Sequence, residues 1–198
     1  MHEKELDKRV ERSRRLLMDA LFSLLEEMPY RKISVAHLAE RSGVARPTFY
    51  LHYKSKDDLL LSYLEVMFEG FYQEVESYFT ERSDADPVIA TIMFKQWSEN
   101  AEAAKLLVQE DIEPIMLAAF KQYVEKIVER FIVAHDLPIS SSTMLPYVVD
   151  FMAGASYMVI TRWIREGMEQ TPEELGDIYA TLVRPGLLAV LLSGKLAD

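Results

Sequence analysis

The chain reads SVAHLAERSGVARPTFYLHY over residues 34–53. Val35 and Leu38 recur at helical spacing, and Gly43 follows at a point where a left-handed backbone favours glycine. A second short helix begins after this turn, with Pro47 in its first turn. Two short helices around a glycine turn are typical of a helix-turn-helix, whose second helix enters the DNA major groove. The stretch therefore predicts a DNA-binding motif.

The second half of this motif resembles a known family. Residues 48–59 read TFYLHYKSKDDL, which is similar to the Tyr-x-His-Phe/Tyr-x-x-Lys-x-x-Leu run of TetR-family transcriptional regulators. The resemblance is specific over about residues 10–70. Within it, Ser42 and Pro47 differ from the residues that are most common in the family. Pro47 is tolerated because the missing N–H breaks no intrahelical bond in a first turn.

Six polar side chains are the candidate DNA contacts: Ser34, Arg46, Thr48, Tyr50, His52 and Lys56. Arg46 can bond guanine O6 and N7 together, and Thr48 can contact a thymine methyl or a phosphate. The resemblance implies that Tyr50 and His52 hold phosphates. Lys56 adds a full charge at a helix amino terminus, where free N–H groups already attract anions. Most of these contacts position the protein rather than read the sequence.

Charge is unevenly distributed along the chain. The formal net charge of −10 argues against nucleic acid as a partner. Residues 1–56 nevertheless hold twelve Lys and Arg against eight Asp and Glu, whereas residues 57–198 hold ten against 24. A basic segment on an acidic body still binds DNA, because phosphate contacts are local. The same asymmetry fits an ordinary solvated surface equally well.

The chain as a whole predicts an all-α fold. Glycine is scarce at seven residues, strand-like alternation is absent, and apolar residues recur at helical spacing. We expect a first helix over residues 6–28 and a long helix over residues 56–80 that joins two domains. Residues 1–56 form the predicted DNA-binding domain, and residues 57–198 form the predicted dimerisation and ligand-binding domain.

Residues 144–161 contain a single charged side chain, Asp150, and predict a helix that is apolar all round. A membrane span explains it poorly, because the run is short and contains Pro146, Asp150 and Tyr157. Burial against its own domain and an identical subunit explains it better. The family resemblance implies a homodimer through the last two long helices. The interface candidates are Trp163, Leu175, Ile178, Tyr179 and Leu182.

TetR-family members usually carry an inducer pocket, so the resemblance also implies a small-molecule ligand. The candidate lining residues are Phe94, Trp97, Met116, Phe120, Tyr123, Tyr147, Asp150 and Phe151. Aromatic and methionine side chains at helical spacing are more commonly ordinary core. Asp150 is the sharper candidate, because a carboxylate in an apolar run must be paired, lie near solvent or face a polar or cationic ligand.

Enzymatic function is disfavoured by the residues present. The chain has no cysteine, and none of its four histidines follows a glutamate by three positions, as helical di-metal sites require. It has no glycine-rich phosphate loop and no Gly-x-Ser-x-Gly elbow. We therefore expect no catalytic residue, no metal and no cofactor. The lack of cysteine and of an apolar signal-peptide core predicts a cytoplasmic protein.

Two functions remain open at this point. The residues and the resemblance favour a transcriptional repressor that binds a palindromic operator as a homodimer and is released by a small-molecule inducer. The alternative is a helical adaptor that binds another protein through the apolar 144–192 region and keeps a vestigial DNA-binding motif. Under that alternative, replacing Tyr50 or Lys56 would change nothing measurable.

Overall fold

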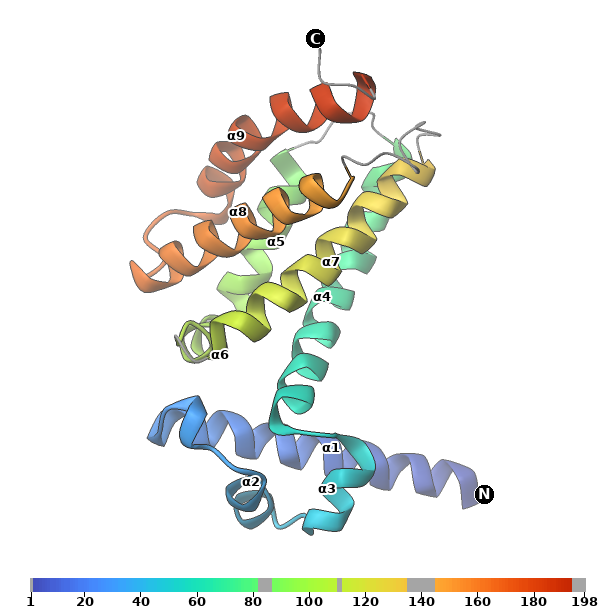
Figure 1. Cartoon of the computed structure of the whole chain (residues 1–198), viewed down its shortest axis with the longest axis vertical. Helices are drawn as coiled ribbons and strands as arrows, with labels where there is room; N and C mark the ends of the chain where they lie inside the picture. The colour runs from blue at the N-terminus through green and yellow to red at the C-terminus, as the bar shows by residue number, and fades with distance from the viewer. Residues whose placement is uncertain (1, 82–86, 110–111, 135–144, 194–198) are drawn as a thin grey trace.

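The structure is a computed structural model that describes residues 2–81, 87–109, 112–134 and 145–193. Its described residues form helices and no strands, which confirms the all-α prediction (Figure 1). The elements are α1 (His2–Glu27), the 3₁₀ turn η1 (Tyr30–Lys32), α2 (Val35–Ser42), α3 (Arg46–His52), α4 (Lys56–Glu81), α5 (Pro87–Glu99), α6 (Ala101–Leu107), α7 (Glu113–Ala134), α8 (Leu145–Arg165) and α9 (Pro172–Ser193).

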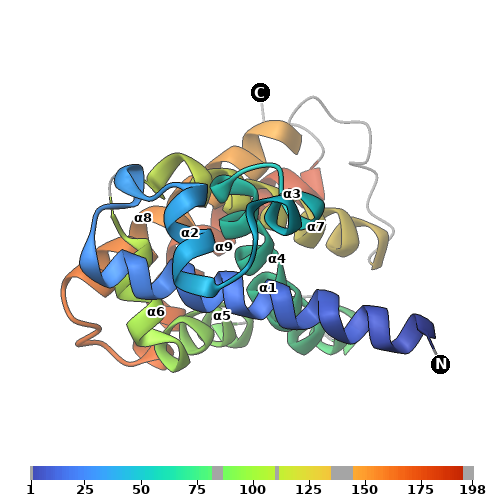
Figure 2. The same cartoon turned by 90° about the horizontal axis from the view of Figure 1, so that it is seen from below.

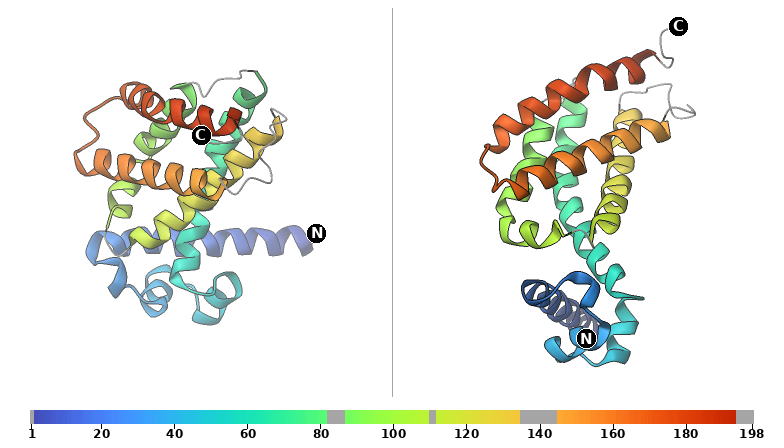
Figure 3. Two further views of the ribbon diagram at one scale, coloured as in Figure 1. Left: turned by 45° about the horizontal axis from the view of Figure 1, so that its top comes forward. Right: turned by 60° about the vertical axis from the view of Figure 1, so that its left-hand side comes forward.

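The helices gather into two groups that α4 connects. At the lower end of Figure 1, α1 lies crosswise with α2 and α3 beneath it. Both short helices contact α1 and each other, and the view from below places them together against it (Figure 2). Helix α4 rises from this group into a bundle with α5 to α9, where α5 packs on α9 and α7 packs on both α4 and α8 (Figures 1 and 3).

Helix ends follow from side chains that the sequence places there. The hydroxyl of Ser34 accepts a hydrogen bond from the His37 N–H at 3.2 Å and begins α2, and Gly43 ends it at φ 69°. At the start of α9 the Thr171 hydroxyl accepts from the Glu174 N–H at 3.2 Å, and the Glu174 carboxylate accepts from the Thr171 N–H at 2.8 Å. This reciprocal pair is a capping box.

Helix α9 approaches α5 closely at Gly176. A Cβ atom at this position would clash with the Thr91 side-chain hydroxyl and would lie 2.9 Å from the Thr91 nitrogen and 3.0 Å from the Thr91 Cα, so only glycine permits this close approach. Further along, Pro185 lies inside α9, and the helix continues past it to Ser193. Pro185 does not end α9, because a helix can pass a proline at the cost of one backbone hydrogen bond.

Helix α8 is covered on one side only. Val148, Val149, Ala153 and Ile160 are buried against the chain's own bundle. The opposite side carries exposed apolar residues, and Figure 3 (right) shows α8 and α9 on the side of the bundle that faces the viewer. No helix within the described ranges is long and apolar enough to span a membrane. The described chain thus leaves one face of α8 without a cover.

Candidate functional site

The helix-turn-helix is held together by a small aromatic and aliphatic core. Leu38 of α2 and Phe49 of α3 are fully buried, and Val44 in the turn between them is nearly so. The ring of Tyr53 lies 5.8 Å from that of Phe49 and is buried with it. Phe49 and Tyr53 are therefore core residues of the DNA-binding motif. Their burial fixes which face of α3 points away from the protein.

The outward face of α3 carries the residues predicted to touch DNA. Arg46 and Tyr50 are both exposed and lie one helical turn apart, with 59% of the Tyr50 side chain accessible. The Tyr50 ring meets Phe49 edge-on at 5.4 Å, which holds it in place. Thr48 is half-buried on the same short helix. Leu51, which the sequence reasoning passed over, is more exposed still at 81%.

His52 and Arg14 lie together at the end of α3. The His52 ring is half-buried 6.2 Å from the Tyr53 ring, and the Arg14 guanidinium of α1 lies 5.6 Å from the Tyr53 ring centroid. Burial, and then the charge of Arg14, lower the pKa of His52 below its usual value. His52 is therefore neutral at neutral pH in the free protein, where its ring has one N–H donor.

Lys56 is half-buried and contacts the protein's own backbone, and its predicted contact with phosphates stays a prediction. Its ammonium donates a hydrogen bond to the Tyr30 carbonyl at 2.6 Å and lies 4.1 Å from the centroid of the Tyr30 ring. The Tyr30 hydroxyl in turn donates to Asp57 at 2.5 Å. Burial and this carboxylate raise the pKa of Tyr30. Lys56 and Asp57 thus clamp the η1 turn to the start of α4.

A chain of hydrogen bonds links Tyr30 to the C-terminal bundle. The Tyr30 N–H donates to the Gln109 side-chain oxygen at 3.2 Å, across the space between the two helix groups. The adjacent carbonyl of Val108 accepts from the Arg165 guanidinium at the end of α8, at 3.3 Å. Hydrogen bonds therefore run from α8 through residues 108–109 and Tyr30 to Lys56. Sequence reasoning missed this connection, since no local pattern marks it.

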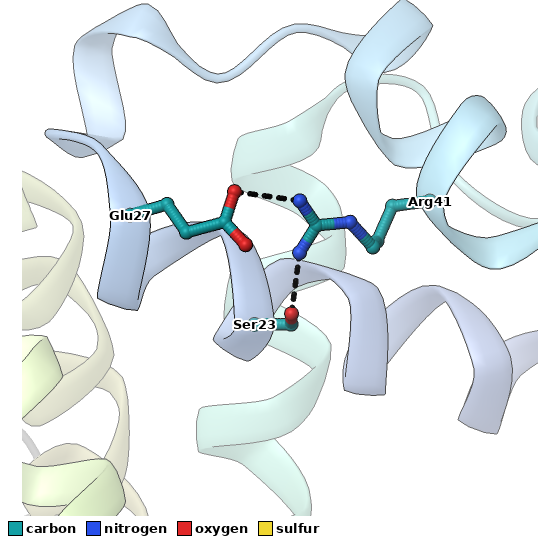
Figure 4. Close-up of polar contacts among 3 residues, drawn as sticks. All are labelled: Ser23, Glu27 and Arg41. Atoms are coloured by element: carbon teal, nitrogen blue, oxygen red, sulfur yellow. Dashed lines mark hydrogen bonds and ion pairs between the residues drawn. The ribbon is translucent and has the colours of Figure 1, made fainter.

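A second polar clamp orients α2 on α1 (Figure 4). The Arg41 guanidinium donates to the Ser23 hydroxyl at 2.5 Å and to the Glu27 carboxylate at 2.6 Å. The hydrogen bond from Arg41 lowers the pKa of Glu27. All three residues are near solvent, so the clamp adds little to the free energy of unfolding and acts mainly by orienting α2 on α1. It fixes the helix that supports α3, and the sequence reasoning did not single it out.

Five of the predicted pocket residues do come together in the C-terminal bundle: Phe94, Trp97, Met116, Phe120 and Tyr123 are all buried. Trp97 and Phe120 stack with ring centroids 5.9 Å apart, and Phe68 of α4 stacks on Tyr123 at 4.7 Å. The cluster is a packed aromatic core. That a ligand enters this aromatic cluster stays a prediction.

The other three predicted pocket residues do not join this cluster. Tyr147 and Phe151 are exposed on the outer face of α8. Asp150 is also exposed, and its carboxylate pairs with the Lys121 ammonium of α7 at 2.6 Å. The assignment of these residues to an interior pocket is therefore corrected. Their helix presents its other face to the core, and Lys121 supplies the partner that Asp150 requires.

Three predicted interface residues also lie elsewhere than expected. Trp163, Leu175 and Tyr179 are buried within the chain's own core. The Trp163 indole donates to the Gln170 carbonyl at 3.0 Å, and the Tyr179 and Ser156 hydroxyls share a hydrogen bond of 2.7 Å. These residues join α8 and α9 to the bundle and are not free to meet a partner. Ile178 and Leu182 are exposed, so their interface role remains a prediction.

Comparisons with known proteins agree with this geometry. The sequence pattern described as "Bacterial regulatory proteins, tetR family" matches residues 17–63, and a TetR pattern described as "Transcriptional regulator C-terminal region" matches residues 87–185. The fatty acid metabolism regulator protein of Bacillus subtilis is 29% identical over 82 residues, which are 41% of this chain and 42% of that protein. The match thus spans less than half of that relative.

Solved structures share the fold over nearly the whole chain. The fatty acid degradation regulator FadR from Bacillus halodurans is 19% identical with a TM-score of 0.61, covering 88% of this chain and 96% of that one. FadR from Bacillus subtilis in complex with stearoyl-CoA is 19% identical with a TM-score of 0.58, covering 86% and 97%. With both domains matched by its patterns, this chain belongs to the TetR family of DNA-binding transcriptional regulators, which are not enzymes.

Proposed function

We propose that the protein is a cytoplasmic repressor that binds a palindromic operator as a homodimer and leaves it when an acyl ligand binds. The observation that carries the DNA part is the outward face of α3. Arg46 and Tyr50 are exposed there on a helix whose opposite side is fixed by the buried Phe49. An exposed arginine at the start of a recognition helix is suited to read guanine in the major groove.

The structure changes the roles we propose for the remaining contacts. Tyr50, Thr48 and the N-cap Ser34 hold phosphates, and neutral His52 adds one N–H donor. Lys56 supports the site indirectly by holding Tyr30 at 2.6 Å. We keep the functional division at residue 56. The first turns of α4 nevertheless pack on α1, where the Phe22 and Tyr63 rings lie 4.7 Å apart.

Dimerisation is proposed through an outer stripe of exposed apolar residues on the last two helices. The stripe consists of Tyr147, Phe151 and Met158 on α8 with Ile178 and Leu182 on α9. Spacings of four and seven residues on α8 and of four residues on α9 keep them on one face of each helix. Large exposed apolar patches mark interaction sites, and a second copy offers the same patch for isologous pairing. Two recognition helices then reach major grooves about 34 Å apart.

The ligand class is proposed from chemistry in the bundle and from a relative. The FadR of Bacillus subtilis was solved with stearoyl-CoA, which combines a long apolar chain with a thioester. The present chain has an aromatic core of suitable character around Phe68, Trp97 and Phe120. The pairing of Asp150 with Lys121 also removes the reason to expect a cationic ligand. An acyl thioester is therefore the first ligand to test.

Replacing Arg46 by alanine should relax base preference without unfolding the protein. Arg46 is exposed, so its loss leaves the core intact, whereas loss of a bidentate guanine contact costs about 1–3 kcal/mol of discrimination per half-site. Binding of wild-type and variant protein to one selected operator and to its single-base variants measures this. Lys95→Ala is the matched control, because it removes one exposed positive charge from α5. Equal losses on every sequence for Arg46→Ala would mean that Arg46 contacts only phosphate.

A further inference from the structure

One buried polar atom in the C-terminal bundle lacks the partner that burial demands. The Tyr123 side chain of α7 is 7% exposed, and its hydroxyl finds no hydrogen-bond partner among the described residues. Buried hydroxyls are nearly always paired, because burial removes their hydrogen bonds with water and an unpaired hydroxyl is not compensated for that loss. Such an atom therefore needs an explanation, and a ligand that completes the bond is one.

A neighbouring hydroxyl provides the contrast. Tyr179 of α9 is buried to a similar extent, and its hydroxyl shares a hydrogen bond of 2.7 Å with Ser156 of α8. Burial, together with the nearby Tyr179 and Tyr72, holds the pKa of Tyr123 well above its usual value. The Tyr123 hydroxyl thus keeps its proton and is available as a donor at any physiological pH.

Tyr123 also lines a hollow between α4 and α7. The hollow has a volume of about 30 Å³, and its inner wall consists of Phe68, Tyr72, Ala119 and Tyr123. Its rim carries polar side chains, among them Glu65 and Lys126. This volume suits about one water molecule or methylene group. A chain of methylenes could therefore enter only by displacing the Phe68 ring, which stacks on Tyr123 at 4.7 Å.

We propose that the Tyr123 hydroxyl is the polar anchor of the ligand site and donates a hydrogen bond to the carbonyl oxygen of an acyl thioester. The thioester's chain passes between α4 and α7 into the aromatic core, and its polar group stays at the rim. A free fatty acid fits less well, because an ionised carboxylate loses more free energy of solvation than a thioester carbonyl when it is buried beside the Tyr123 hydroxyl. This inference rests on the proposed ligand response and specifies its site.

The position of the hollow connects the ligand to DNA binding. Phe68 and Tyr72 belong to α4, the same helix that begins at Lys56 beside Tyr30. Side chains in a close-packed interior do not compress, so a chain between α4 and α7 must move one helix relative to the other. Any shift of α4 reaches the clamp of Lys56 on Tyr30 and thereby the support of α3.

The test compares Tyr123→Phe with Tyr179→Phe in the full-length protein. Each variant loses a single hydroxyl, but only the Tyr179 hydroxyl has a partner within the described chain. Tyr123→Phe should leave the melting temperature of the free protein unchanged or raise it, and should weaken stearoyl-CoA binding roughly 3- to 10-fold. Tyr179→Phe should lower the melting temperature, because Ser156 loses its partner.

Binding is followed by titration calorimetry, with tryptophan emission as a second readout because the Trp97 ring stacks on Phe120 in the same core. Stearoyl-CoA, stearate and free CoA are the three probes, and stearoyl-CoA should bind most tightly. Wild-type affinity for stearoyl-CoA in Tyr123→Phe would overturn the anchor while leaving an acyl response intact. A wild-type protein that binds none of the probes would overturn the anchor and the proposed ligand class together, while selective operator binding would still support the regulator.

Discussion

Replacing Leu182 by glutamate is expected to convert the protein into a monomer and to lower operator affinity by at least ~100-fold. Leu182 is 69% exposed in the single chain, so the substitution should leave the monomer's own stability nearly unchanged. In the proposed dimer the same side chain is covered by its two-fold partner. An uncompensated buried charge then costs about 3–5 kcal/mol of dimerisation free energy, and the two-fold symmetry places one such charge on each subunit.

Sedimentation equilibrium and operator titration measure the two consequences of Leu182→Glu separately. Val66→Glu is the matched control, because Val66 is 74% exposed on α4 and lies outside the outer stripe. The control should remain a dimer and should retain operator affinity. A Leu182→Glu protein that stays dimeric would place the interface elsewhere. One that becomes monomeric but binds the operator with full affinity would show that dimerisation does not serve DNA binding.

Replacing Gly176 by alanine should destabilise the C-terminal bundle by about 1–3 kcal/mol. An added Cβ would lie 2.9 Å from the Thr91 nitrogen and 3.0 Å from its Cα. Backbone atoms cannot rotate away as the end of a flexible side chain can, so α9 must move off α5. This movement also loosens the buried residues between the two helices, among them Phe94 and Tyr179, whose rings lie 6.1 Å apart.

Urea unfolding measures the effect of Gly176→Ala, and Gly70→Ala is its matched control. A Cβ at Gly70 of α4 would meet only the Gln96 side-chain nitrogen at 3.5 Å, which is ordinary contact. Alanine is the better helix former, so the control should gain about 0.5–1 kcal/mol. Equal stability gains in both variants would contradict the close approach of α5 and α9.

The DNA-binding half of the fold could be predicted because its determinants are local. Gly43 and the N-cap Ser34 act on backbone atoms within a few residues, and their observed geometry follows from residue type. Phe49 follows the turn at a spacing that directs it inward. Lys56 shows where local reasoning ends. Its partner is the carbonyl of Tyr30, 26 residues earlier, and only the packed η1 turn brings the two together.

The C-terminal half was harder to interpret, because α8 is apolar on both faces. Nothing in the sequence distinguishes Phe151, which faces outward, from Phe120, which is fully buried. The choice depends on which neighbours cover each face, and the chain's own bundle covers only one face of α8. The same ambiguity placed Trp163 at the interface, although Phe94 covers its ring within the chain at 5.5 Å. Periodicity identifies helices but not their partners.

Selection of bound duplexes from a random pool tests the claim that two copies of this chain read an inverted repeat. Binding at ~0.15 M salt suppresses contacts that depend on phosphate charge alone. We expect an enriched palindrome with half-sites about one helical turn apart, bound by a dimer. A confirmed dimer that enriches no sequence would contradict the claim and would favour a helical adaptor that uses the outer stripe to bind another protein.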